Sequence, residues 1–363
     1  MQLTTRKLNR VLFMKNTSTL TNVFTHFLKA TFAFTLILCQ TLTYAEEMTP
    51  FELWLGELRE ESTALGVSKT TIELAFSEIT APVKHIIKKD RSQPEVVQTY
   101  SSYLTARVTQ WKKEKGQKFL SQHAILLKEI AQAFGVQPRF IVAIWGMETN
   151  YGSYPLKESV FNVLATLAYD NRRAKFFRAQ FLAAIRMLDS GFPDYKNMKS
   201  SWAGAMGQTQ FIPESYFRYA VDFDKDGKKD IWETKADIFA SIANYFKTRE
   251  WRDDQTWGRV VLLPTNGEKE LPGKQAEGVE PAKTCSRFKT LGVWRDLQEW
   301  QKLGVRKEFG ADLPKVSIPA ALVLGDPNDN KAYLVYQNFC TIMSYNPSFK
   351  YALSIGLLSD LFN

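Results

Sequence analysis

The chain has 363 residues, 45% of them hydrophobic, with 47 basic and 38 acidic side chains. This length and composition can bury one large core or two lobes, which excludes a protein that is disordered over most of its length. The first 45 residues hold five of the basic side chains and no acid, so 42 basic and 38 acidic side chains remain beyond them. This mild positive excess suits an anionic polymer and does not imply nucleic acid.

Residues 1–45 have the pattern of a signal peptide: a basic lead, a short apolar run at residues 30–38, and a small exit residue, Ala45. We expect this segment to be removed on export to the periplasm, with Met14 as an alternative start. Cys39 offers a second interpretation, a lipoprotein signal that would anchor the chain to the outer membrane. Leu38 argues against it, because such signals have a small residue before the cysteine.

Removal of residues 1–45 leaves two cysteines, Cys285 and Cys340. In an oxidising periplasm they could pair, and the alternative is two buried free thiols. The histidines His85 and His123 have no metal-ligand spacing, and neither lies near a cysteine. The sequence therefore does not indicate a zinc site or a Cys/His nucleophile.

The first half of the remaining chain has helical spacing of its apolar residues from about residue 51 to residue 134. A further helix starts at Pro138 and runs without a polar break through residues 140–145. Asn150 and Gly152 end it, which places Glu148 in its last turn. Apolar surroundings and the negative end of the helix dipole both predict a raised pKa for Glu148.

A carboxylic acid that keeps its proton near neutral pH is the group that can protonate the leaving oxygen of a glycosidic bond. Position alone, however, favours a structural acid that caps its neighbours or pairs with an arginine, because structural carboxylates outnumber catalytic ones.

More helices are predicted at residues 160–169, 172–188 and 236–246, and a short one begins at Pro213. The pattern changes after Trp257. Short strands are predicted at residues 260–263, 320–324 and 333–336, around a segment rich in Gly, Pro, Lys and Glu. A closing helix is predicted from Pro347 to about residue 362, with Asn346 as its N-cap.

Residues 222–233 fit the EF-hand loop pattern, in which acids at alternating positions surround a cation and a glycine permits the sharp turn. The candidate ligands are Asp222, Asp224, Asp226, the carbonyl of Lys228, Asp230 and Glu233. Helical patterns flank the loop on both sides, so we expect a structural calcium site. The alternative is an acidic surface turn, which the three lysines of the loop would partly neutralise.

A second cluster, residues 201–213 with the sequence SWAGAMGQTQFIP, follows the Glu148 motif by some fifty residues. The two motifs and the acidic loop occur in the order of the lytic murein transglycosylase B family, which the chain resembles from about residue 51 to its end. The resemblance implies an α+β fold, mainly α, with a lysozyme-like catalytic core. It also implies a helical lobe at residues 46–120, the core at 121–257, a small β-containing insertion at 258–338 and a closing segment at 339–363.

Enzymes of that family cleave the bond between N-acetylmuramic acid and N-acetylglucosamine in peptidoglycan and leave a 1,6-anhydro end. The resemblance implies that Glu148 is the catalytic acid, that no cofactor serves catalysis, and that glycan strands and the wall-synthesis machinery are partners. The residues that match the glycan cleft of the family are Tyr103, Arg172, Arg173, Ser201, Gln210, Tyr245, Tyr345, Asn346 and Tyr351. Arg172 and Arg173 also suit the carboxylates of a peptide stem.

Three features separate this chain from parts of that family. Ser344 stands where many relatives have Arg, and the lipid anchor of membrane-bound members has weak support. We also expect no separate peptidoglycan-binding module after the closing helix. Ordinary structural explanations remain open for the matched residues: the tyrosines could be core aromatics, Arg172 and Arg173 a solvated helix start, and Ser201 a turn residue.

Glycosidases that hydrolyse their substrate generally need two carboxylates, and neither Glu158 nor Asp170 is a convincing second one. In a transglycosylase the C6 hydroxyl of the substrate attacks instead, so one glutamate can serve as acid and then as base. The alternatives are a hydrolytic muramidase on the same fold and a non-catalytic, calcium-dependent wall-binding protein.

Overall fold

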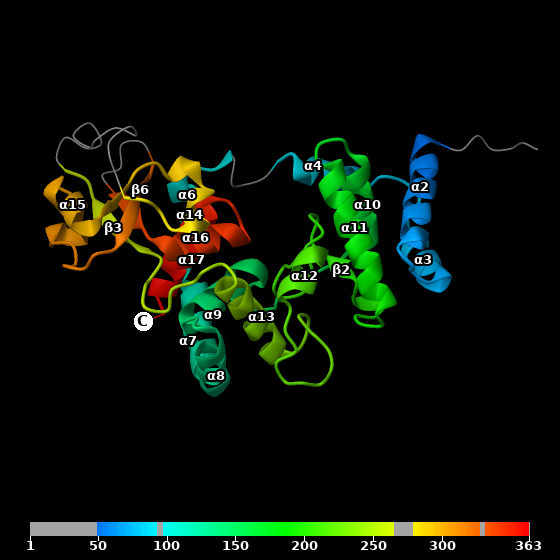
Figure 1. Cartoon of the computed structure of the whole chain (residues 1–363), viewed down its shortest axis with the longest axis horizontal. Helices are drawn as coiled ribbons and strands as arrows, with labels where there is room; N and C mark the ends of the chain where they lie inside the picture. The colour runs from blue at the N-terminus through cyan, green and yellow to red at the C-terminus, as the bar shows by residue number, and fades with distance from the viewer. Residues whose placement is uncertain (1–48, 93–96, 265–278, 327–330, 363) are drawn as a thin grey trace, which may run out of the picture. The chain divides into compact units, whose positions relative to one another are not determined.

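The computed structural model describes residues 49–92, 97–264, 279–326 and 331–362 (Figure 1). The predicted signal peptide and Cys39 lie outside them. Residues 54–363 form one compact unit, which holds the elements described below except the first four residues of helix α2. Among the described helices, none combines the length and the apolar character needed to cross a membrane.

The helices before the β-rich part match the predicted helical pattern closely. They are α2 (Pro50–Ala64), α3 (Lys69–Phe76), α4 (Lys84–Asp90), α6 (Tyr100–Arg107), α7 (Gln110–Gln122), α8 (Ala124–Phe134), α9 (Pro138–Thr149), α10 (Val160–Tyr169), α11 (Ala174–Asp189), α12 (Pro213–Tyr219) and α13 (Lys235–Lys247). Short strands β1 (Glu158–Ser159) and β2 (Lys199–Ser200) pair antiparallel.

Helix α9 is the buried centre of this arrangement. It packs against α7, α8, α13 and α17 (Phe349–Asp360), and nine of its twelve residues are buried. Its apolar run allows burial on all sides, which is the pattern of a core helix. In Figure 1, α7, α8 and α13 lie around α9, and α10 packs on α11 elsewhere in the unit.

The second half of the chain contains a five-stranded antiparallel sheet with the order β4-β6-β7-β3-β5. Its strands are β3 (Gly258–Leu262), β4 (Trp294–Asp296), β5 (Arg306–Lys307), β6 (Pro319–Leu324) and β7 (Lys331–Val335). The three predicted strands are β3, β6 and β7, each displaced by no more than two residues at either end. The domain boundaries assigned from the sequence stay predictions.

One face of the sheet carries a small apolar core with the helix α15 (Leu297–Lys302), in which Leu297, Trp300, Val261 and Leu334 are buried. The Trp300 indole also donates a hydrogen bond of 2.9 Å to the carbonyl of Ala320 in β6. Strand pairing is therefore supported by side chains of the helix that follows β4.

A disulfide joins Cys285, in α14 (Lys283–Ser286), to Cys340, in α16 (Gln337–Tyr345). This settles the question that the sequence left open in favour of the paired form. The bond fixes the segment after α14 to the helix that leads to Tyr345.

The closing helix begins later than predicted. α17 starts at Phe349, and its N-cap is Ser348, whose hydroxyl accepts a hydrogen bond from the amide of Tyr351. The assignment of Asn346 as N-cap is wrong, because Asn346 is the residue that ends α16. Further along α17, Gly356 lies against the Trp257 ring. A Cβ at this position would stand 2.3 Å from the ring, so the close packing requires glycine.

Candidate active site

Glu148 is the penultimate residue of α9 and is partly exposed in an otherwise buried stretch. The helix ends as the sequence predicts: Asn150 adopts a left-handed conformation, and Tyr151 and Gly152 follow with positive φ. The amide of Tyr151 bonds back to the carbonyl of Trp145 at 3.3 Å. Two consecutive non-glycine residues in this conformation make a sharp turn, a kind of strain that is common beside functional groups.

Two tyrosines, Tyr351 and Tyr345, interact with the carboxyl group of Glu148. The Tyr351 hydroxyl donates a hydrogen bond to Glu148 Oε1, and the hydroxyl of Tyr345 donates to the carbonyl of Thr209. Burial raises the pKa of Tyr351 and of Tyr345 well above the usual value, and the charge of Glu148 adds to this effect. Both phenols therefore keep their protons and act as donors across the ordinary pH range.

The other predicted cleft tyrosines support this pair. Tyr245 packs against Tyr345 with ring centroids 4.7 Å apart, and its hydroxyl donates to the carbonyl of Ser344. Tyr103 is 1% exposed and its electrostatic influence reaches Tyr351. These tyrosines form a linked cluster, and Tyr351 is the member that contacts the carboxyl group of Glu148.

The loop of residues 201–213 contacts the tyrosine cluster through a backbone carbonyl, that of Thr209. The Ser201 hydroxyl accepts hydrogen bonds from the amides of Ala203 and Ala205, at 3.4 and 3.3 Å. Gln210 has a positive φ of 52°, and its side-chain amide donates to the Gly207 carbonyl at 3.1 Å. Ser201 and Gln210 thus hold the shape of the loop that supplies the Thr209 carbonyl to Tyr345.

Gln208 is a residue that sequence reasoning missed. Its side-chain oxygen accepts a hydrogen bond of 2.8 Å from the Trp145 indole of α9, and its side-chain nitrogen donates to the carbonyl of Trp232. It therefore ties α9 to the loop of residues 201–213 and to the end of the acidic loop. The sequence shows Gln208 and Gln210 on either side of Thr209. Nothing in it indicates that Gln208, and not only Gln210, has a role in the site.

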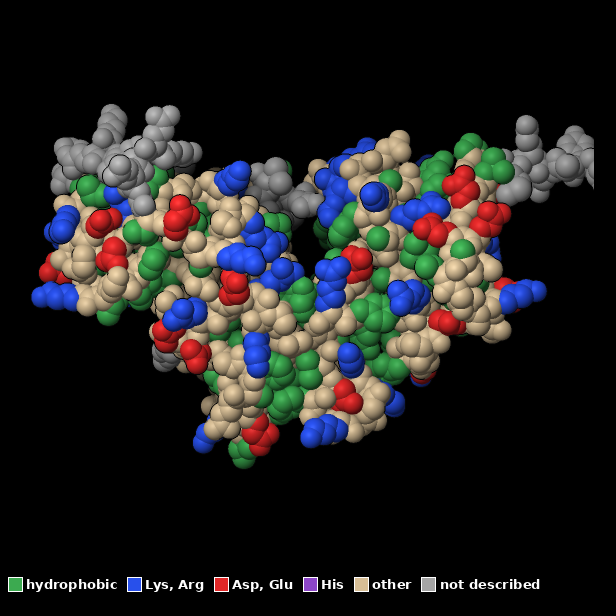
Figure 2. All heavy atoms as spheres, viewed as in Figure 1, with side chains coloured by type: hydrophobic (Ala, Val, Ile, Leu, Met, Phe, Trp, Pro, Cys, Tyr) green, Lys and Arg blue, Asp and Glu red, His purple; other side chains and the backbone are tan. Residues whose placement is uncertain are grey.

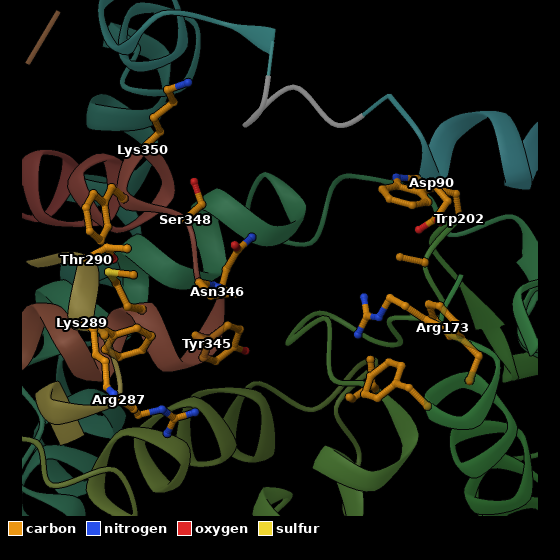
Figure 3. A pocket seen from close by; sticks show the side chains of 18 of the residues that line it. Asp90, Arg173, Trp202, Arg287, Lys289, Thr290, Tyr345, Asn346, Ser348 and Lys350 are labelled. Carbon is orange, nitrogen blue, oxygen red and sulfur yellow. The ribbon is translucent and has the colours of Figure 1, made fainter. Parts of the chain in front are cut away.

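A cleft of about 1060 Å³ opens beside this cluster (Figure 3). Tyr345, Asn346, Ser348 and Lys350 stand on one side with Arg287 and Lys289, whereas Arg173 and Trp202 stand on the other. Glu148 is not among the described residues that line the cleft. Its link to the cleft runs through Tyr351 and through Tyr345, which lines it.

The two predicted arginines diverge. Arg173 lines the cleft, whereas Arg172 pairs with the buried carboxylate of Asp90. Among the described residues of the cleft wall, Asp90 is the one acid, and its charge is offset by Arg172. In Figure 2, Lys and Arg side chains gather on both sides of the hollow at the centre of the view. The cleft therefore favours anionic groups.

The two acids weighed as a second carboxylate are engaged elsewhere. Asp170 forms an ion pair with Arg91 at 2.9 Å, and Glu158 lies 3.0 Å from the His85 Nε2. The titratable groups on which Glu148 exerts a charge effect are Tyr345, Tyr351 and Lys112, and none of these three is a carboxylate.

The acidic loop folds between α12 and α13 as expected, but the carboxylates that gather are not the full predicted set. Within the described residues, ligand atoms that lie within 4.8 Å of one another belong to Asp222, Asp224 and Asp237. Asp237, in the first turn of α13, lies beyond the twelve-residue pattern, so nothing in the sequence singled it out. Its carboxylate accepts hydrogen bonds from the amides of Phe223 and Asp230, both at 2.7 Å.

The other predicted ligands shape the loop. Asp226 accepts a hydrogen bond from the Lys228 amide at 2.8 Å, and Asp230 accepts from the amides of Trp232 and Glu233. Burial raises the pKa of Asp237, and the charges of Asp224 and Asp222 add to this, against the two amide hydrogen bonds. Three converging carboxylates that repel one another fit a hard divalent cation.

Comparison with known proteins shows which family the chain matches. The family model of the transglycosylase SLT domain matches residues 50–360. Over 249 residues the chain is 33% identical to membrane-bound lytic murein transglycosylase B of Escherichia coli K12; the match covers 68% of this chain and 63% of that relative.

Solved structures are also similar over most of the chain, among them the following two. The first, SltB3 from Pseudomonas aeruginosa in complex with NAG-anhNAM-pentapeptide, has a TM-score of 0.77 and 39% identity, covering 87% of this chain and 80% of that one. The second, the Escherichia coli lytic transglycosylase Slt35 in complex with calcium, has a TM-score of 0.68 and 26% identity, covering 85% and 91%. The predicted fold class, mainly helical with a lysozyme-like core and a small sheet, is confirmed.

Proposed function

Since the chain belongs to the transglycosylase SLT domain family, we propose that it is a lytic transglycosylase that cleaves the glycan strands of peptidoglycan, with Glu148 as its acid and then its base. The observation that carries this proposal is the hydrogen bond from Tyr351 to a single carboxyl group at the end of a buried helix. The engagement of Asp170 and Glu158 elsewhere supports a mechanism with one carboxylate.

In the proposed first step, Glu148 gives its proton to the oxygen that bridges N-acetylmuramic acid and N-acetylglucosamine, and the bond from this oxygen to the anomeric carbon breaks. The C6 hydroxyl of the same muramic acid then attacks the anomeric carbon, and Glu148 takes the hydroxyl proton. The product has a 1,6-anhydro end, no water is consumed, and Glu148 returns to its starting form. Attack within one sugar has a large proximity advantage over attack by a second molecule.

Replacement of Glu148 by Gln tests this assignment, because the amide keeps the size of the side chain and cannot donate the acidic proton. We expect cleavage of purified peptidoglycan to fall by at least about a thousand-fold, since general acid catalysis and the later base step are both lost. The exposed acid Glu129 of α8 supplies the control variant, Glu129→Gln, which should cleave normally.

Mass spectrometry of the released fragments separates the proposal from its closest rival. A transglycosylase releases products one water lighter than those of a hydrolytic muramidase. Hydrated products from the native protein, or full activity in Glu148→Gln, would contradict the proposal. Glycan binding without any product would favour the non-catalytic wall-binding protein.

We also propose that Asp222, Asp224 and Asp237 hold a calcium ion, because their oxygen ligands converge at the start of α13. The ion would supply positive charge that offsets the repulsion among the three carboxylates. This role is structural: the loop contains Trp232, whose carbonyl accepts a hydrogen bond from Gln208, and Gln208 in turn accepts one from the Trp145 indole of α9.

The basic cleft suits the carboxylates of the peptide stems that peptidoglycan carries. Arg173, Arg287, Lys289 and Lys350 line it, against the acid Asp90. We assign the stem peptide to the basic side chains of this cleft and the sugar to the part of the same cleft beside Tyr345 and Asn346. The disulfide between Cys285 and Cys340 supports export to an oxidising compartment, the periplasm, where its substrate lies.

A further inference from the structure

Lys112 is a buried cation that the mechanism above does not use. It lies in the first turn of α7 and is only 6% exposed. Its Nζ donates to the Sδ of Met147 at 3.6 Å, and a thioether is a weak acceptor. Among the described side chains it forms no ion pair with a carboxylate. A buried ammonium in such surroundings lowers stability, which makes a functional role worth testing.

Three helices and the turn after α9 present defined groups to Lys112 or to the Met147 sulfur that it contacts. At the end of α6, Arg107 repels its charge, whereas Glu148 in α9 attracts it. The Tyr151 hydroxyl, just after α9, donates to the Lys112 carbonyl at 2.5 Å and fixes this turn of α7. From α17, Ser354 donates to the same sulfur of Met147 at 3.8 Å.

The balance of these effects keeps Lys112 charged at neutral pH. Burial, and then Arg107, lower its pKa to about 8, while Glu148 acts in the opposite direction. Because Met147 precedes Glu148 in the chain, the ammonium is held next to the catalytic residue by a contact with its neighbour. Tyr351 donates to Glu148 within the same cluster.

We propose that Lys112 is a positioning residue for Glu148, whose carboxylate its buried ammonium stabilises once the proton has passed to the leaving oxygen. This inference rests on the proposed function. A single acid that must give and then retake a proton forms its carboxylate in poorly solvated surroundings, where no second carboxylate shares the task. A fixed positive charge nearby stabilises the carboxylate that Glu148 forms when it gives its proton to the leaving oxygen. The same charge opposes the rise in the pKa of Glu148 that burial alone would cause.

The test is Lys112→Met, which removes the charge and keeps a long apolar side chain. We expect kcat to fall about 10- to 100-fold with KM changed by less than about two-fold, because the interaction matters most in the transition state. The alkaline limb of the pH profile of kcat/KM should move up by about one pH unit, because Glu148 loses its proton less easily without the cation.

Two further variants make the result specific. Lys112→Arg keeps the charge, so it should recover kcat to within about ten-fold of the native enzyme and return the alkaline limb toward its native position. Lys118, exposed on the same helix, supplies the matched control Lys118→Met, which should behave as native. A merely structural role would lower the amount of folded enzyme and leave the alkaline limb where it is.

The inference is wrong if Lys112→Met keeps native kcat and the native pH limb, or if the Met and Arg variants lose activity equally with an unmoved limb. A Met variant that does not fold would also contradict it, because removal of a buried charge without an ion-pair partner should stabilise the chain. An active Glu148→Gln enzyme would overturn the proposed function itself, whereas an inactive one beside a normal Lys112→Met enzyme would overturn only the role of Lys112.

Discussion

The Lys112 ammonium also links stability to pH. Its folded-state pKa is about 8, against 10.5 when solvated, chiefly because burial disfavours the charged form. Below pH 8 both states hold the proton, so the burial cost is fully present. Between pH 8 and 10.5 the unfolded chain still holds the proton and the native chain has released it, so stability rises with pH in this window.

We expect Lys112→Met to be more stable than the native chain near pH 7 and to lose up to about 3 kcal/mol of this advantage by pH 10, since one pKa unit corresponds to about 1.4 kcal/mol. Urea unfolding of both proteins at several pH values measures the difference. The comparison cancels the buried tyrosines, which both proteins share. A difference that does not change with pH would show that Lys112 is solvated in the folded protein.

Local sequence signals located Glu148, because a helix end is decided by neighbours: Pro138 begins α9 and Asn150 ends it. The same reasoning failed for Asn346, where Ser348 offered an equally good cap two residues later. It could not assign Arg172, whose partner Asp90 is 82 residues away. Lys112 gave no signal either, since a lysine within a helix usually lies at the surface.

At the scale of elements, the short strands were predictable from composition, and their order in the sheet was not. Alternating apolar residues indicate a strand, whereas the partner of that strand depends on which edges meet. β3, for example, pairs with β7 and with β5. The acidic loop shows the same limit: its pattern was visible, but Asp237 joins it only because α13 begins where it does.

The loop and α13 should respond together to calcium. A cation that binds only the native state stabilises it in proportion to the logarithm of its concentration above the dissociation constant, about 2.7 kcal/mol at a hundred-fold excess. We expect the midpoint of thermal unfolding to rise on adding millimolar calcium and to fall with a chelator. Asp237→Asn should remove most of the calcium-dependent shift, because it removes one of the three converging charges.

Asp194→Asn is the control for that experiment, since this exposed acid lies outside the loop and pairs weakly with Lys196 at 3.9 Å. Equal calcium shifts in the native chain and Asp237→Asn would mean that Asp237 is not a ligand. No shift in either would leave the loop as an acidic surface turn, which was the alternative from the sequence.

At the scale of the whole unit, the disulfide connects the sheet-bearing part of the chain to the candidate active site. Cys285 lies two residues before Arg287, and Cys340 lies on the helix that ends at Tyr345. Arg287 and Lys289 are therefore fixed on the same side of the cleft as Tyr345 (Figure 3). The sugars themselves offer no carboxylates to these two cations. We therefore expect their charge to act on the peptide stem.

This placement predicts a dependence on the peptide stem. The double variant Arg287→Gln and Lys289→Gln should raise KM for stem-bearing peptidoglycan by about three- to ten-fold, the effect of losing partly exposed ion pairs. Cleavage of glycan strands stripped of their stems should not change, because those strands have no carboxylates to place in this part of the cleft. Lys283→Gln is the matched control, an exposed lysine of α14 that does not line the cleft.

The native preference for stem-bearing strands should weaken as salt is raised, since salt screens exposed charges. An equal loss on both substrates would mean that the two cations support the fold of the cleft and do not bind the stem.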